Sequence, residues 1–175
     1  LGAKTLQNAL DTIGPRHPLA LSAMGNFASA LNLLGEYEQA LQFLEMGLKI
    51  NNDVYGEKHP RALVARSNFA SVLMSQGRAT EALPHFERAL SHHTEVYGEK
   101  DPNTLTMLNN YAMALRDMGR YADAAPHLER SFKLHAEVRG EKHHMTLIAL
   151  HNHALSVDAL GRSREALPLF ERSLR

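Results

Sequence analysis

The sequence contains no cysteine, which excludes disulfide bonds, a thiol nucleophile and cysteine-ligated zinc. It has no net charge either, because 19 lysines and arginines balance 19 aspartates and glutamates, and both signs are interspersed along the chain. Without a positive field, nucleic acid and anionic membrane surfaces are not expected as partners. With 44% hydrophobic residues, the 175-residue chain should still fold around a core, which packing alone must stabilise.

Long apolar runs are missing as well. The longest stretch without charge, residues 18–35, is interrupted by serines, asparagines and a glycine, so it does not match the roughly 20 apolar residues that span a bilayer. The chain begins with Leu1 and shows no signal peptide. We expect a cytoplasmic protein, of which this chain is an excised fragment.

Enzyme motifs are also missing. The chain has no nucleophile elbow, phosphate-binding loop, dinucleotide fingerprint or zinc-protease motif, so we predict a non-enzymatic protein without a cofactor. No two of the eleven histidines are four residues apart, the spacing that places two ligands on one helical face. We therefore predict no metal site and interpret the histidines as loop and surface residues. Three of them share one loop position: His17, His59 and His143.

What the sequence does contain is an internal repeat. One hexapeptide recurs every 42 residues, and the glycines at 35, 77, 119 and 161 keep the same register. The copies are YGEKHP (55–60), YGEKDP (97–102), RGEKHH (139–144) and, more loosely, IGPRHP (13–18). One structural unit is therefore repeated along the chain.

Each unit is predicted to be a pair of antiparallel helices. In the second full unit, apolar residues recur at helical spacing over 60–76 and again over 80–96. Gly77 between them suits the left-handed position after a helix end. One pair cannot bury its apolar stripe alone, so we expect an all-α fold in which pairs stack into a solenoid.

The predicted organisation is a single array over residues 1–175. It consists of the end of a preceding second helix (1–12), three full units (13–54, 55–96 and 97–138) and a truncated unit (139–175). We expect further repeats on either side. No polar capping helix is recognisable, so weak homo-association through uncapped ends is expected.

The columns at Ala70, Gly77, Ala82, Phe86 and Ala89 resemble the small-residue and aromatic pattern of tetratricopeptide (TPR) repeats. The 42-residue period and the Tyr-Gly-Glu-Lys-Asp-Pro loop are more similar to the longer repeat of kinesin light chains. The resemblance covers the whole chain. It implies a right-handed superhelix, with the first helix of each unit lining a concave groove that binds a protein or peptide.

An asparagine column lies in the predicted first helices, at Asn26, Asn68, Asn110 and Asn152. Asparagine is a poor helix former, so four copies need an explanation. In the resembled families, equivalent asparagines contact the main chain of the ligand, for which an amide supplies both donor and acceptor. Alternatively, these amides tie adjacent first helices together. Both interpretations remain open.

The smallest neighbours of this column lie in the first two full units. The predicted peptide-binding site consists of the four asparagines with Gly25, Ser29, Ser67, Ser71 and Met113. Asp117 is the one charged residue that we place on the groove faces, so binding should depend weakly on salt. The leading hypothesis is a non-enzymatic scaffold that binds an extended peptide. The alternative is a self-assembly or regulatory sensor module of a larger signalling protein.

Overall fold

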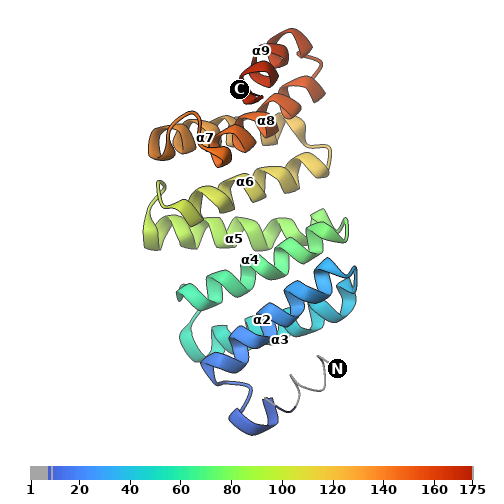
Figure 1. The fold of residues 1–175 in the computed structure, drawn as a ribbon, viewed down its shortest axis with the longest axis vertical. Coiled ribbons are helices and arrows are strands. Elements are labelled where there is room, and N and C mark those ends of the chain that lie inside the picture. Colours follow the sequence, from blue (N-terminus) through green and yellow to red (C-terminus); the bar gives the residue numbers. More distant parts are fainter. Residues whose placement is uncertain (1–7, 9, 175) are drawn as a thin grey trace. The chain divides into compact units, whose positions relative to one another are not determined.

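The computed structural model of the protein describes residue 8 and residues 10–174 (Figure 1). Every regular element in that part of the chain is a helix. The helices are α2 (Pro18–Leu33), α3 (Tyr37–Tyr55), α4 (Pro60–Ser75), α5 (Ala79–Tyr97), α6 (Pro102–Asp117), α7 (Tyr121–Arg139), α8 (His144–Ala159) and α9 (Ser163–Ser173). The predicted helices at 60–76 and 80–96 agree with α4 and α5 to within one residue at each end. The helix segment expected at 1–12 lies mostly outside the described residues.

Glycines explain where the helices end. A glycine with φ between +75° and +86° follows each helix from α2 to α8 and also the helical residues before α2. These glycines recur at intervals of 21 residues: Gly14, Gly35, Gly56, Gly77, Gly98, Gly119, Gly140 and Gly161. Other residues adopt this left-handed conformation only with strain. The loops that contain these glycines have three or four residues, which makes consecutive helices antiparallel.

The shared loop histidines are helix N-caps. In His17, His59 and His143, Nδ1 accepts a hydrogen bond from the backbone N–H two residues later, at 3.2 Å in each case. Asp101 occupies the same position before α6, and its carboxylate accepts two backbone N–H groups at 2.8 and 3.2 Å. This loop column therefore satisfies backbone donors that the first turn of a helix leaves free.

The chain divides into two compact units, one ending at Ala89 and the other beginning at Leu90. In the first unit, α3 packs against α2 and α4, and α2 also contacts α4 (Figure 1). The core of this unit includes Met24, Leu44, Leu63 and Phe86, each at most 4% exposed. The first helices α2 and α4 are thus neighbours, and α3 lies behind them.

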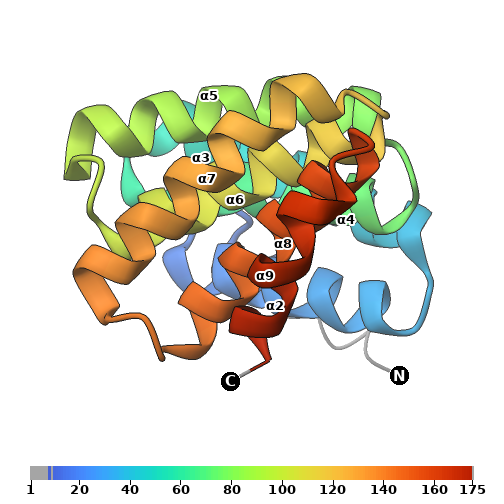
Figure 2. The same cartoon turned by 90° about the horizontal axis from the view of Figure 1, so that it is seen from above.

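The second unit repeats this arrangement. The helix α7 packs against α6 and α8, α9 packs against α8, and α6 contacts α8. Figure 2 shows α8 and α9 of this unit from a second direction. The core includes Leu105, Leu115, Leu128 and Leu150, each at most 1% exposed. The predicted assembly of all repeats into a single array stays a prediction.

The interpretation of the histidines as loop and surface residues is wrong for His93 and His135. They are 5% and 1% exposed and lie on α5 and α7. Nδ1 of His135 lies 3.0 Å from the carbonyl oxygen of Ser131 one turn earlier. Burial lowers the pKa of both imidazoles, which keeps them neutral inside the core.

The glutamate of the repeated loop has a structural partner. Glu57, Glu99 and Glu141 each pair with an arginine 31 residues later, at 2.5, 2.7 and 2.7 Å: Arg88, Arg130 and Arg172. The pairs connect the loop before each first helix with the second helix of the same repeat. These contacts are largely exposed, so each contributes little to stability.

None of the helices in the described part of the chain combines the length and the hydropathy needed to cross a bilayer.

Candidate functional site

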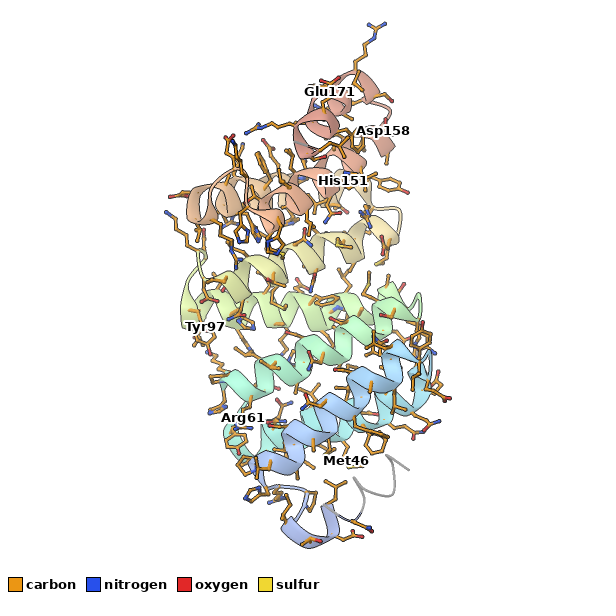
Figure 3. The ribbon with its side chains drawn as sticks, in the orientation of Figure 1. Met46, Arg61, Tyr97, His151, Asp158 and Glu171 are labelled. Atoms are coloured by element: carbon orange, nitrogen blue, oxygen red, sulfur yellow. The ribbon has the colours of Figure 1, made fainter. Side chains whose placement is uncertain are left out.

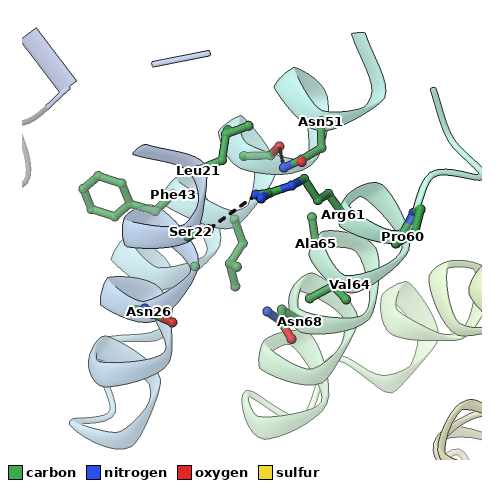
Figure 4. Close-up of a pocket in the computed structure, with 13 residues that line it drawn as sticks. Leu21, Ser22, Asn26, Phe43, Asn51, Pro60, Arg61, Val64, Ala65 and Asn68 are labelled. Carbon is green, nitrogen blue, oxygen red and sulfur yellow. Dashed lines mark hydrogen bonds between the residues drawn. The ribbon is translucent and has the colours of Figure 1, made fainter. Parts of the chain in front are cut away.

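A pocket of about 370 Å³ opens in the first unit between α2 and α4, with α3 as its floor (Figure 4). Its apolar walls include Leu21, Leu44 and Val64, one from each helix. A second pocket of about 220 Å³ lies nearer the C-terminal ends of α2 and α4. Leu44 and Asn68 line both pockets, so the two pockets lie next to each other. We call the two together the α2–α4 groove.

The groove contains most of the site residues predicted for the first unit. Gly25, Asn26 and Asn68 line the first pocket, and Ser29, Asn68 and Ser71 line the second. The hydroxyl groups of Ser29 and Ser71 donate to carbonyl oxygens one turn earlier, at 3.0 and 2.9 Å. Such serines occupy little space and keep few free polar atoms.

Ser67 lies elsewhere. Its side chain is buried, its hydroxyl donates to the carbonyl of Leu63 at 2.8 Å, and it lines neither pocket. The role of Ser67 in peptide binding stays a prediction.

The asparagine column splits into two kinds. Among the described residues, the amides of Asn26, Asn68 and Asn110 make no hydrogen bond within the protein, and none of the three is buried. Figure 4 shows Asn26 on α2 and Asn68 on α4, on opposite walls of the first pocket. These two amides are therefore free to pair with a ligand.

Asn152 is bound inside the second unit. Its Nδ2 donates to Oδ1 of Asn109 at 3.2 Å, and its Oδ1 accepts from Arg116 at 3.5 Å. Asn109 in turn donates to Sδ of Met113 at 3.3 Å. This network connects α6 to α8, as the alternative interpretation of the column requires. Met113, another predicted site residue, is half-buried within it.

The sequence prediction missed a cation in the groove. Arg61, at the start of α4 (Figure 3), extends across the first pocket to α2. Its Nη1 donates weakly to the carbonyl of Pro18 and the hydroxyl of Ser22, at 3.3 and 3.4 Å. The guanidinium carbon also lies 5.9 Å from the ring centre of Tyr55. Arg61 precedes Asn68 by seven residues, or two helical turns, so the same helical spacing could have identified it.

Two residues of the pocket floor were also missed, Phe43 and Asn51. The ring of Phe43 packs edge-to-face on Phe27, with centroids 5.2 Å apart. Phe69 with His85 and Tyr111 with His127 repeat this contact at 4.9 and 5.2 Å. The floor beneath the pocket is thus a regular element of the repeat.

Family models of the tetratricopeptide repeat match residues 20–61, 60–131 and 103–175. The chain belongs to the tetratricopeptide repeat family. This match covers most of the sequence and confirms the resemblance stated above. A search of curated protein sequences found no match.

Several solved structures have a fold similar to that of this TPR chain. One contains the TPR-like repeats of a kinesin light chain from P. anserina, with a TM-score of 0.85 at 22% identity; the match covers 98% of this chain and 82% of that one. BtubC (BKLC) from P. vanneervenii gives 0.79 at 18% identity, covering 90% and 63%. A Rap protein complexed with Competence and Sporulation Factor gives 0.74 at 14%, covering 88% and 41%. These matches confirm the all-helical TPR solenoid fold.

Proposed function

We propose that this TPR chain is a non-enzymatic scaffold that binds an extended peptide segment of a partner protein in the α2–α4 groove. A TPR solenoid is in general a protein-interaction scaffold. One observation supports placing the peptide here: the unpaired amides of Asn26 and Asn68 lie on opposite walls of an apolar pocket.

The chemistry of the groove suits an extended backbone. Each amide offers a donor and an acceptor, as a peptide unit does, so the two asparagines can pair with main-chain groups on either side of one residue. The side chain of that residue then enters the apolar pocket between Leu21, Leu44 and Val64. An apolar anchor with a few placed polar groups gives such a site affinity and orientation.

The electrostatics of the groove favour weak salt dependence. Of the residues that line its two pockets, Arg61 alone is charged. A ligand that binds in these pockets therefore neutralises at most one cation. Added salt has little electrostatic attraction to screen, so it should weaken binding only slightly. Protein or peptide segments fit this surface better than nucleic acid or a membrane, which need several cations.

The proposal is tested by selecting peptides against the chain from a displayed library and measuring affinity by calorimetry. Asn26→Ala and Asn68→Ala should each weaken binding about fivefold, the equivalent of one hydrogen bond, with little change in melting temperature. Asn110→Ala tests the predicted role of Asn110 in peptide binding in the same way. Asn152→Ala is the matched control, because it should lower the melting temperature and leave the affinity intact. Loss of stability without loss of affinity in the first two variants contradicts the proposal.

A second candidate function, self-assembly, is favoured by the surface of α9. Leu167 and Leu174 on and after this helix are 60% and 84% exposed. The two leucines are seven residues apart, or two helical turns, and exposed apolar side chains that gather on one face mark contact sites between protein chains.

A further inference from the structure

Two glycines lie in helix interiors, Gly25 in α2 and Gly47 in α3, and both line the first pocket of the α2–α4 groove. All the other described glycines have positive φ and end helices. Glycine within a helix is destabilising relative to alanine, because it loses more backbone freedom on folding. These two positions therefore need a reason other than the helix itself.

The fold does not require glycine at either position. A Cβ atom at Gly25 would meet nothing within 4 Å, and one at Gly47 would meet only Cε of Met24, at an ordinary 3.9 Å. The other repeats carry side chains at the same two positions, namely Ser67, Asn109 and His151 for Gly25, and Ala89, Ser131 and Ser173 for Gly47. What the two glycines change is the pocket, which they leave deeper at its α2 wall and its floor.

An independent observation points to a missing ligand group. Asn51 follows Gly47 by one turn and lines the same pocket, and it is only 5% exposed. Its Nδ2 donates to the carbonyl of Gly47 at 2.7 Å, as Figure 4 shows. Its Oδ1 has no hydrogen-bond partner among the described residues. A buried acceptor without a donor is unfavourable, and a donor on a bound ligand would satisfy it.

We propose that Gly25 and Gly47 determine which side chain anchors the peptide. They leave space for a ring that packs against the backbone of α2 and α3, and Asn51 Oδ1 accepts a hydrogen bond from a donor on that ring. The anchor is therefore an aromatic side chain with a hydroxyl or N–H group. This inference rests on the proposed function, because it assigns the occupant of the same groove.

The test uses N-acetyl-tyrosinamide as the probe, titrated into the full chain in the millimolar range and followed by amide NMR shifts. N-acetyl-phenylalaninamide is the matched probe without the donor. The expected variants are Gly25→Ala and Gly47→Ala, together with Gly47→Ser, which introduces the residue of the same position in α7. Each should weaken binding of the tyrosine probe about tenfold or more, as an added methyl group does in a filled pocket.

The two alanine variants should at the same time raise the melting temperature by about 2–4 °C. This combination of higher stability and lower affinity separates a site residue from a structural one. Ser131→Ala is the control, since it removes a buried hydroxyl without a partner in the second unit and should leave probe affinity unchanged.

Three results would overturn the inference. Equal probe affinity in the wild type and the glycine variants shows that the glycines do not set the pocket depth. Equal affinity for the tyrosine and phenylalanine probes removes the role of Asn51. Absence of shifts at pocket residues shows that no ring enters. The proposed function is judged separately, by the selected peptides and the variants of Asn26 and Asn68.

Discussion

Arg66 is a buried charge in a core position of the first unit. The same position is Met24, Leu108 and Leu150 in the other repeats. The Arg66 side chain is 6% exposed, and its Nη2 lies 3.6 Å from Oε1 of Glu57, which is an ion pair without a hydrogen bond. Burial lowers the pKa of Arg66, the nearby positive charge of Arg88 lowers it further, and Glu57 raises it. We predict that this arginine destabilises the fold.

The size of the effect follows from what each substitution leaves behind. In Arg66→Met the buried charge is replaced by a residue already found in this column, and Glu57 keeps Arg88 as its partner at 2.5 Å. Replacing a buried ion pair by apolar residues is often stabilising, here by about 1 kcal/mol or more. That corresponds to an increase of roughly 2–4 °C in melting temperature. Glu57→Gln instead leaves Arg66 buried without its carboxylate and should cost about 1–3 kcal/mol, since the pair is partly solvated.

Thermal and urea unfolding, followed by circular dichroism, measure both effects. Glu99→Gln is the matched control, because Glu99 occupies the same loop position and its partner Arg130 is half exposed, so its loss should be hard to detect. In the Arg66→Met background, Glu57→Gln should then cost no more than this control. A loss of stability in Arg66→Met as large as that in Glu57→Gln would refute the reasoning, because Arg66 would then be a net stabilising residue.

Three further predictions concern caps, acid and association. His17→Asp should raise the melting temperature at neutral pH and Asp101→His should lower it, because a carboxylate caps a helix better than a neutral imidazole; an unchanged pair would argue against the capping role. Burial lowers the pKa of His93 and His135 below the ordinary 6.5. In the unfolded chain these imidazoles regain their ordinary pKa and bind more protons, so the free energy of unfolding should be highest above about pH 6.5 and should decrease below it. Urea titrations at several pH values measure this, and a free energy of unfolding that does not change with pH would contradict it. Leu167→Lys should reduce any self-association seen by sedimentation velocity, and an unchanged profile would exclude the α9 face.

The period and the helix ends could be predicted from the sequence because backbone chemistry determines them. Gly77 and Gly98 have positive φ, and Pro60 and Pro102 stand at the first helical position, where a missing N–H is tolerated. Four copies of each glycine signal and three copies of the proline average out the ambiguity of any single one. The small residues near Asn68 predicted where a peptide could fit, and two pockets open there; that a peptide binds in them stays a prediction.

The side-chain contacts could not be predicted in the same way, because they depend on which neighbour a side chain meets. Asn110 and Asn152 are equivalent in sequence, yet only Asn152 lies against a second amide, that of Asn109. The burial of His135 was missed because a polar residue within a helix gave no sign that its imidazole would pair with a carbonyl oxygen of its own helix, that of Ser131 one turn earlier. Repeat register identifies the face of a helix, but not the partner across it.

Departures from the repeat columns therefore carry the individual properties of this chain. Arg66 stands in a core column that is otherwise apolar, and Gly25 and Gly47 stand at helix positions where the other repeats carry side chains, so each departure costs stability. For Arg66 the compensation lies within the protein, because Glu57 offsets part of its charge. For Gly25 and Gly47 none is found among the described residues, where nothing approaches the missing Cβ of Gly25 within 4 Å. The proposed anchor would supply it, because a side chain bound in this pocket fills the space that the two glycines leave, and the equivalent positions of the second unit carry side chains of their own.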